Sequence, residues 1–225
     1  MTTPTPFSPA ALTDALVFFR QYTRTVRATG AIAPSGAALS RALVRHVRPG
    51  GPDRPRAVLE VGPGTGAVTR HLVERLGPHD SLDLVESNPQ FADRLAAALS
   101  NDPRLASVAP RTRLHRGPVQ DQPLATYDTI VCGLPFANFA PLEIEAVFRQ
   151  LLTALNPGGR LSFFSYAGGA TLQKLSRRPA AARRALRSAI APHLERSELV
   201  MPNLPPAYVH HLASSAPERQ EAATR

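Results

Sequence analysis

A glycine-rich turn between a short apolar run and a helical pattern constrains the fold of this chain more than any other feature. The run Ala57–Val61 has the character of a buried parallel strand, and it leads into Gly62, Gly64 and Gly66. These glycines permit a tight turn and let a ligand approach bare backbone. The helical pattern over 67–76 then offers free N–H groups and a positive dipole end. The segment predicts a strand–turn–helix unit that can hold a carboxylate or phosphate.

Strand and helix patterns alternate along the following residues. Short apolar runs predict strands over 81–86, 127–132 and 160–166, and a further strand is predicted over 112–116. Helical spacing predicts helices over 89–100 and 142–155, and Asn-Pro-Gly-Gly predicts a turn over 156–159. Strands that alternate with helices form a parallel sheet covered on both faces. We therefore expect an α/β fold.

Two helical patterns precede this region. Ser8 and Pro9 begin an apolar stripe over 9–29, and a second pattern covers 35–47. We accordingly divide the chain into an N-terminal helical extension or lid over 1–50, a core domain over 51–213, and a flexible tail over 214–225.

Composition excludes several classes of protein. The chain has 225 residues with 26 Lys and Arg against 17 Asp and Glu, a net charge of +9. Its single cysteine, Cys132, excludes a disulfide framework and a multi-cysteine metal site, and we expect it to be buried packing. No cluster of Cys and His suggests a metal site, so we expect no metal. We also expect no membrane span, because no apolar run is long enough to cross a bilayer. The start of the chain shows no secretory signal, so we expect a cytoplasmic protein.

Two acidic residues sharpen the interpretation of the glycine-rich turn. Glu60 ends the first strand, so the spacing is E-x-G-x-G-x-G, which is that of S-adenosylmethionine (SAM) enzymes rather than of a dinucleotide fingerprint. Glu86 ends the next strand, 20 residues after Gly66. An acid at that distance can accept hydrogen bonds from both ribose hydroxyls of an adenosine. We therefore predict SAM as cofactor.

A third segment, Val131–Phe139, follows a strand that we expect in the middle of the sheet. Ligands of such sheets bind beyond the carboxyl ends of the strands. The segment resembles the (Asn/Asp)-Pro-Pro-(Tyr/Phe) loop of amino-methyltransferases, except that Gly133 replaces the side chain that accepts hydrogen bonds from the amine. Backbone carbonyls could still orient an amine, whereas readout of a flipped adenine is disfavoured.

Four segments together resemble a known family. They are Gly30–Ser35, Leu59–Thr69, Gly133–Phe136 and Asn203–Ala207. On these segments the chain resembles class I SAM-dependent methyltransferases, and within them it is most similar to bacterial phospholipid N-methyltransferases. The resemblance implies a Rossmann-like, mostly parallel seven-stranded sheet and stepwise methylation of phosphatidylethanolamine. One departure is Pro118, which follows Arg116-Gly117 where such enzymes often carry an aspartate that meets the adenine; Gln120, Asp121 or backbone could serve instead.

The predicted site residues follow from these segments. The residues expected to bind the cofactor are Glu60, Gly62, Pro63, Gly64, Thr65, Gly66, Glu86, Ser87 and Gly133. Those expected to bind the acceptor are Leu134, Pro135, Phe136, Asn138, Phe139 and Tyr208. Aromatic faces attract N-methylated cations, although Phe136 and Phe139 could equally be core residues.

Methyl transfer to an amine needs the neutral amine, so a base or a desolvated pocket is required. Three candidates for the base are Tyr22, Tyr166 and His210. Each has a simpler alternative role: Tyr22 in the packing of the N-terminal stripe, Tyr166 within the sheet, and His210 at a strand edge.

Two basic segments suggest contact with an anionic membrane. The helix expected over 9–29 carries arginines beside an apolar face, and residues 174–187 include six basic side chains. The enzyme would then lie at the inner face of the membrane. Alternatively, the first helix is a lid on its own domain and the second segment a solvated helix face.

Three rival functions remain open at this level. They are methylation of a soluble small molecule, methylation of ribosomal RNA adenine, and SAM binding without turnover. An exposed apolar face around Phe18 and Phe19 would favour a lipid, and a buried one a soluble substrate. Gly133 and the absence of an added RNA-binding domain disfavour nucleic acid.

Overall fold

The computed structural model describes residues 34–136, 139–166, 179–201, 203 and 206–214. The helix predicted over 9–29, Tyr22, Asn138 and the tail beyond Ser214 lie outside the described residues. No helix in the described ranges is long and apolar enough to cross a membrane.

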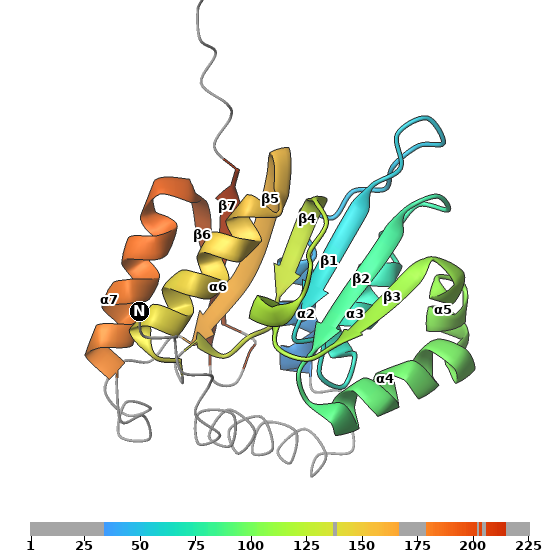
Figure 1. Ribbon diagram of the computed structural model, residues 1–225, viewed down its shortest axis with the longest axis horizontal. Coiled ribbons are helices and arrows are strands. Elements are labelled where there is room, and N and C mark those ends of the chain that lie inside the picture. Colours follow the sequence, from blue (N-terminus) through green and yellow to red (C-terminus); the bar gives the residue numbers. More distant parts are fainter. Residues whose placement is uncertain (1–33, 137–138, 167–178, 202, 204–205, 215–225) are drawn as a thin grey trace, which may run out of the picture.

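Seven strands of the described chain form one sheet in the order β3-β2-β1-β4-β5-β7-β6 (Figure 1). The strands are β1 (Ala57–Val61), β2 (Ser81–Glu86), β3 (Thr112–Arg116), β4 (Tyr127–Cys132), β5 (Leu155–Tyr166), β6 (Leu194–Val200) and β7 (Ala207–Ala213). The first five run parallel, and β7 runs antiparallel to both β5 and β6. The expected mostly parallel seven-stranded sheet is therefore confirmed.

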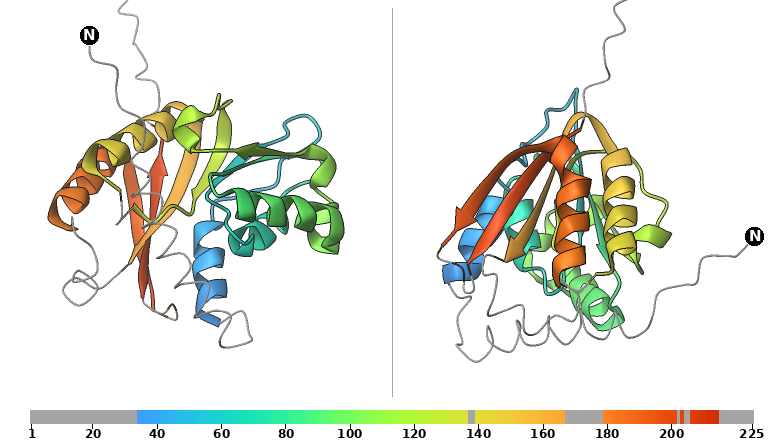
Figure 2. Two further views of the ribbon diagram at one scale, coloured as in Figure 1. Left: turned by 60° about the horizontal axis from the view of Figure 1, so that its bottom comes forward. Right: turned by 90° about the vertical axis from the view of Figure 1, so that its left-hand side faces the viewer.

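Helices cover both faces of this sheet (Figure 2). The helices are α2 (Pro34–Leu43), α3 (Ala67–Val73), α4 (Pro89–Asn101), α5 (Pro103–Ala106), α6 (Pro141–Thr153) and α7 (Pro179–Ile190), with short 3₁₀ turns at η1 (Ala109–Arg111), η2 (Val119–Asp121) and η5 (Ala191–His193). The first four of these helices lie on one face, and α6 and α7 lie on the other.

Alternate side chains of the central strands pack into two hydrophobic cores, one on each face of the sheet. In β1, Leu59 and Val61 pack toward α6, whereas Val58 packs toward α2 and α3. All three are at most 1% exposed, which explains why the strand is apolar on both faces apart from Glu60. Residues 34–50 of the predicted extension contribute to the second core through Leu43 and Val44, which are also buried.

Strand β5 departs from the sequence prediction. The turn predicted over 156–159 is wrong, because β5 begins at Leu155 and continues through this segment. Leu155 pairs with Tyr127, but the next pairing is Arg160 with Thr129, so the intervening residues form an irregularity within the strand. Gly158, at φ 75°, takes the left-handed conformation that this irregularity requires.

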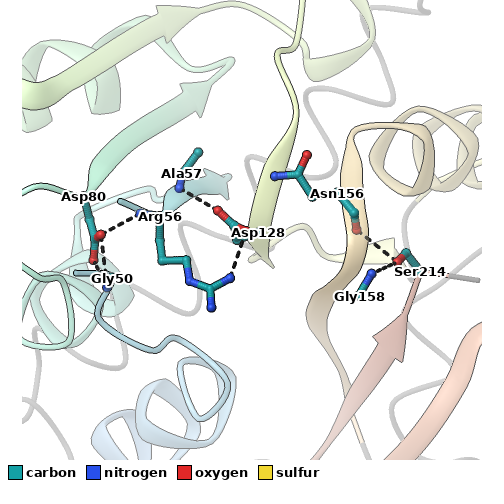
Figure 3. A network of polar contacts seen from close by, with 8 residues as sticks. All are labelled: Gly50, Arg56, Ala57, Asp80, Asp128, Asn156, Gly158 and Ser214. Atoms are coloured by element: carbon teal, nitrogen blue, oxygen red, sulfur yellow. Dashed lines mark hydrogen bonds and ion pairs between the residues drawn. The ribbon is translucent and has the colours of Figure 1, made fainter. Parts of the chain in front are cut away.

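Carboxylates and hydroxyls anchor the chain at the amino-terminal edge of the sheet (Figure 3). Asp80 accepts hydrogen bonds from the N–H groups of Gly50, Arg56 and Gly77 at 2.7–3.2 Å. Ser214 accepts from Gly158 N and donates to Asn156 O, so the first residue of the predicted tail is tied to β5. These structural contacts lie at the edge opposite the carboxyl ends of the parallel strands, where ligands of such sheets bind.

Candidate functional site

The loop after β1 is shaped by three glycines in the left-handed region. Gly62, Gly64 and Gly66 have φ values of 71°, 57° and 78°. Gly62 N donates to the carbonyl of Val85 on β2 at 2.9 Å, which fixes the loop at the carboxyl ends of β1 and β2. Side chains are strained at such φ values, so the glycine spacing recognised in the sequence is a requirement of the backbone.

Glu60 lies beneath this loop and is almost fully buried. Its Oε2 and the hydroxyl of Thr69 are among the few buried side-chain atoms of the described residues that have no hydrogen-bond partner. Burial raises the pKa of Glu60 to about 8, and the nearby Glu86 carboxylate adds to the rise. The Thr69 hydroxyl lies near enough to offset part of the rise, without reaching hydrogen-bond geometry. A buried acid in this state is suited to a cationic ligand group.

Glu86 is held by the backbone around it. Its Oε2 accepts from Gly64 N at 2.9 Å, and its Oε1 accepts from Asn88 N at 2.8 Å. Burial raises its pKa, and these N–H groups, with that of Ser87, offset the rise. The predicted ribose ligand therefore also ties the glycine loop to the end of β2.

Gly133 brings the third predicted segment against the glycine loop. Gly133 N donates to Val61 O at 2.7 Å, and a Cβ at this position would lie 2.8 Å from Gly62 O. Any side chain here would collide with the backbone of the loop. The glycine that departs from the amino-methyltransferase pattern is thus explained by the close approach of two loops.

The aromatic residues of this segment differ in burial. Phe136 is 3% exposed, and its ring lies 4.7 Å from that of Phe148 and 5.7 Å from that of Phe163, so it belongs to the core. Phe139 is partly buried, 5.5 Å from Phe136. Leu134 and Pro135 are half-buried beside them.

The remaining acceptor and base candidates lie on the last strands. Tyr208 is exposed at the start of β7. Tyr166 ends β5, half-buried, with its ring 5.3 Å from that of Phe164. His210 is half-buried on β7 and holds both ring nitrogens in contact with serines.

One residue near the loop escaped the sequence analysis. Arg70 of α3 donates through Nη1 to the carbonyls of Thr65 and Gly66 at 3.3 and 3.1 Å, and its Nε donates to Asp102 at 3.1 Å. It joins the glycine loop to the α4–α5 junction. No feature of the sequence indicates this contact, because its partner Asp102 between α4 and α5 lies 32 residues farther along the chain.

Comparison with known proteins agrees with this geometry. Residues 59–161 match the family model described as a methyltransferase domain. An ornithine lipid N-methyltransferase from Singulisphaera acidiphila is 30% identical over 65% of this chain and 74% of that protein. The chain belongs to the class I SAM-dependent methyltransferases.

Two further similarities place this methyltransferase among diverse relatives. An rRNA methyltransferase from Streptomyces thermotolerans is 36% identical over 44% of this chain and 30% of that protein. The O-methyltransferase TomG from Streptomyces achromogenes, solved in complex with SAM, shares the fold with a TM-score of 0.58 at 18% identity, over 93% of this chain and 91% of that one.

The residues of this methyltransferase fit its cofactor, SAM. SAM carries a positive sulfonium and ammonium, a carboxylate and a ribose. The unpartnered Glu60 oxygen offers the negative charge, and the left-handed loop that precedes α3 provides close backbone approach. Of the residues considered for the adenine contact, Gln120 is half-buried and Asp121 is exposed in η2, so both remain candidates for that contact. No group of three or more potential metal ligands gathers in the described part of the chain.

Proposed function

We propose that this methyltransferase N-methylates the amine headgroup of a membrane lipid such as phosphatidylethanolamine. The observation that carries the proposal is a rim of exposed apolar side chains at the carboxyl-terminal edge of the sheet, where the candidate site lies. The ornithine lipid N-methyltransferase relative supports the same class of substrate.

Four residues form this apolar rim: Leu142, Leu199, Met201 and Tyr208, which are 77%, 45%, 64% and 41% exposed. Leu142 opens α6 just after the loop that follows β4. Leu199 near the end of β6 and Tyr208 near the start of β7 are cross-strand partners, and Met201 directly follows β6. Of the large hydrophobic residues exposed in the described ranges, only Leu194 lies elsewhere, at the other end of β6. Exposed apolar side chains along one edge are typical of a surface that contacts another apolar phase.

Helix α7 carries exposed positive charge. Arg183, Arg184 and Arg187 are exposed on α7, and none forms an ion pair within the described residues. They belong to the basic segment 174–187; its other members, Lys174, Arg177 and Arg178, lie outside the described residues. Exposed, unpaired arginines favour an anionic lipid surface, each contributing about 1 kcal/mol.

The loop after β4 supplies groups suited to an amine. Within the described residues, no hydrogen bond occupies the carbonyls of Gly133 and Pro135. They could accept from the two N–H groups of a neutral amine while Leu134 and Phe139 exclude water. SAM supplies an activated methyl group, so the protein contributes chiefly orientation and the neutral state of the acceptor.

The test is to follow methyl-labelled SAM into defined acceptors. Vesicles of phosphatidylethanolamine with an anionic lipid, free ethanolamine, and ribosomal RNA are offered separately to the purified protein. We expect label in the lipid fraction with wild type, and loss of it in Glu60→Gln but not in Asp93→Asn, an exposed control on α4. Label in ethanolamine or RNA without label in lipid would contradict the proposal.

A further inference from the structure

We infer that Ser165 and His210 form a proton relay that carries the proton of the acceptor ammonium from the active-site mouth to solvent through Ser197. This inference rests on the proposed amine acceptor and adds the groups that deprotonate it. Of the three residues only His210 was a candidate from the sequence, with no partner assigned to it.

The hydrogen bonds of His210 link three strands in one row. Its Nε2 lies 2.8 Å from Ser165 Oγ on β5, and its Nδ1 lies 2.8 Å from Ser197 Oγ on β6. If the Ser165 hydroxyl donates to Nε2, then Nδ1 carries the ring proton and donates to Ser197. The row therefore offers an unbroken chain of exchangeable protons.

The register of the sheet places the inner end of this row beside the candidate site. Cys132, the last residue of β4, pairs with Phe163, and Ser165 lies two residues farther along β5. Ser165 thus lies level with Leu134 of the loop after β4. Since alternate residues share a face, it is also on the side of the sheet where Phe163 meets Phe136.

The two ends of the row differ in exposure. Ser165 is half-buried at the carboxyl end of β5, whereas Ser197 is exposed on the edge strand β6. A proton that enters at Ser165 can therefore leave at Ser197 without crossing the core. The exposure of Ser197 gives the row a contact with water, which a proton relay requires and a structural cluster does not.

The surroundings of His210 favour a neutral, proton-accepting ring. The imidazole stacks on Phe163 at 4.8 Å, and burial lowers its pKa, with a smaller contribution from His211. The groups that face it are Phe163 and Ser165 from β5, Ser197 from β6, and Tyr208 and His211 from its own strand. No carboxylate of the described residues is among them, so nothing holds a proton on the ring in advance.

His211 shows what a structural histidine looks like in the same strand. It is fully buried, its Nδ1 bonds Ser162, and its Nε2 lies 3.3 Å from Glu198, which pairs with Arg45. Its ring packs on His46 at 4.5 Å. That network joins Arg45 and His46, which follow α2, to the sheet. Among the described residues, it does not include Ser165 or the loop after β4.

The proposed step is a proton transfer that balances within the row. The ammonium N–H bond breaks and its proton passes to Ser165 Oγ, as the Ser165 hydroxyl proton moves to Nε2 of His210. The amine keeps its lone pair for the methyl group, and the imidazolium passes a proton through Ser197 to water. No electron transfer or further reactant is required.

The experiment compares kcat against pH for wild type, Ser165→Ala and His210→Gln, with Ser188→Ala and His79→Gln as exposed controls outside the row. Glutamine retains hydrogen bonding to the serines but cannot take up a proton. We expect both relay variants to lose about 10²-fold in kcat at pH 7, within the usual range for general base catalysis, with the KM for SAM unchanged. Their rates should then rise about tenfold per pH unit toward the pKa of the amine, while the wild-type rate should depend less on pH over the same range, because burial lowers the pKa of His210 and keeps its ring able to accept a proton.

Two outcomes separate the relay from the proposed function. If wild type methylates the aminolipid but His210→Gln keeps its rate and its pH profile, the relay is wrong and the proposed function stands. If wild type methylates no amine at any pH while it binds SAM, the proposed function fails, and the relay with it. Thermal unfolding of each variant checks that a lost rate is not lost folding.

Discussion

The Glu60 carboxyl group is buried, so its negative charge is unfavourable unless a cation binds beside it. The residue is 1% exposed and has an unpartnered oxygen beneath the glycine loop. Its pKa of about 8 means that the free protein binds a proton there at neutral pH. A site that binds a cation at this position must release that proton, so cofactor affinity and pH are linked.

We predict that SAM binding releases a proton below pH 8. Affinity should rise with pH up to about 8 and level off above it, because the raised pKa of free Glu60 falls when the positive cofactor binds. Glu60→Gln should abolish the release and weaken binding at least about tenfold. Calorimetric titration in buffers of different ionisation heat measures both. Proton uptake, or release unchanged in the variant, would contradict the assignment.

The same substitution should stabilise the free protein. A raised carboxyl pKa favours folding at low pH, and that contribution is lost as pH rises from about 4.5 through 8. The glutamine variant escapes this loss, so its free energy of unfolding should exceed that of wild type by roughly 2–4 kcal/mol at pH 8, with little difference at pH 4.5. Urea unfolding at both pH values checks the sign. A variant less stable at pH 8 would show that Glu60 supports the fold.

At this scale the sequence predicted the residues whose signal is local. The glycines and Glu60 belong to one short motif, so they can be recognised from neighbouring residues alone. Arg70 and Ser165 did not, because their roles depend on Asp102 and His210, which come from distant elements. Phe136 shows the converse, since its motif suggested substrate contact and its ring packs in the core.

The parallel strands depend on short loops anchored at their amino-terminal edge. Asp80 holds three segments there, the end of the α2 region at Gly50, the start of β1 at Arg56, and the turn at Gly77 (Figure 3). It is fully buried, and each of its bonds satisfies a backbone donor. The anchor acts between elements, on the edge opposite the site.

We predict that Asp80→Ala destabilises the protein by about 3–5 kcal/mol, because it leaves several backbone N–H groups without an acceptor. SAM affinity of the folded fraction should stay within about twofold. Asp93→Ala, which breaks only an exposed pair with Arg116, should cost less than about 1 kcal/mol. Equal losses in the two variants, measured in urea, would show that the Asp80 contacts contribute little.

The limits of four strands were predictable to the residue, whereas those of the last strands were not. The four strands predicted between 57 and 132 match β1 to β4. Strand β6 carries charged residues and is mostly exposed at the sheet edge, so no apolar run marks its limits. The irregularity in β5 was read as a turn because its glycines are turn residues.

The whole molecule presents its apolar rim along one edge of the sheet and exposed arginines along the outer helix α7. We predict that replacing Arg183, Arg184 and Arg187 with glutamine lowers affinity for anionic vesicles about 10²-fold, at roughly 1 kcal/mol each. The same change at Arg54, Arg75 and Arg94, also exposed, should have little effect. Vesicle sedimentation at 0.05 and 0.5 M salt measures the charge term. Equal effects of the two triple variants would show nonspecific attraction.

The apolar rim should act independently of salt. We predict that Met201→Ser with Leu142→Ser lowers vesicle binding by about tenfold or more, since each side chain buries apolar surface. Leu194→Ser provides the matched control, because Leu194 is exposed at the far end of β6. If the double variant binds vesicles as well as the control does, the rim is not part of the membrane interface. Cofactor affinity should be the same in all three proteins.

The reversed direction of β7 divides the molecule into halves that can diverge separately. Loops after β1 and β2 hold the groups predicted for the cofactor, while β5, β7 and β6 lie on the other side of β4. Because β7 runs antiparallel to both β5 and β6, the end of β6 and the start of β7 lie at the carboxyl-terminal edge of the sheet and belong to one stretch of chain. A lineage could exchange this stretch, and with it the molecule that is methylated, while inheriting its cofactor chemistry intact.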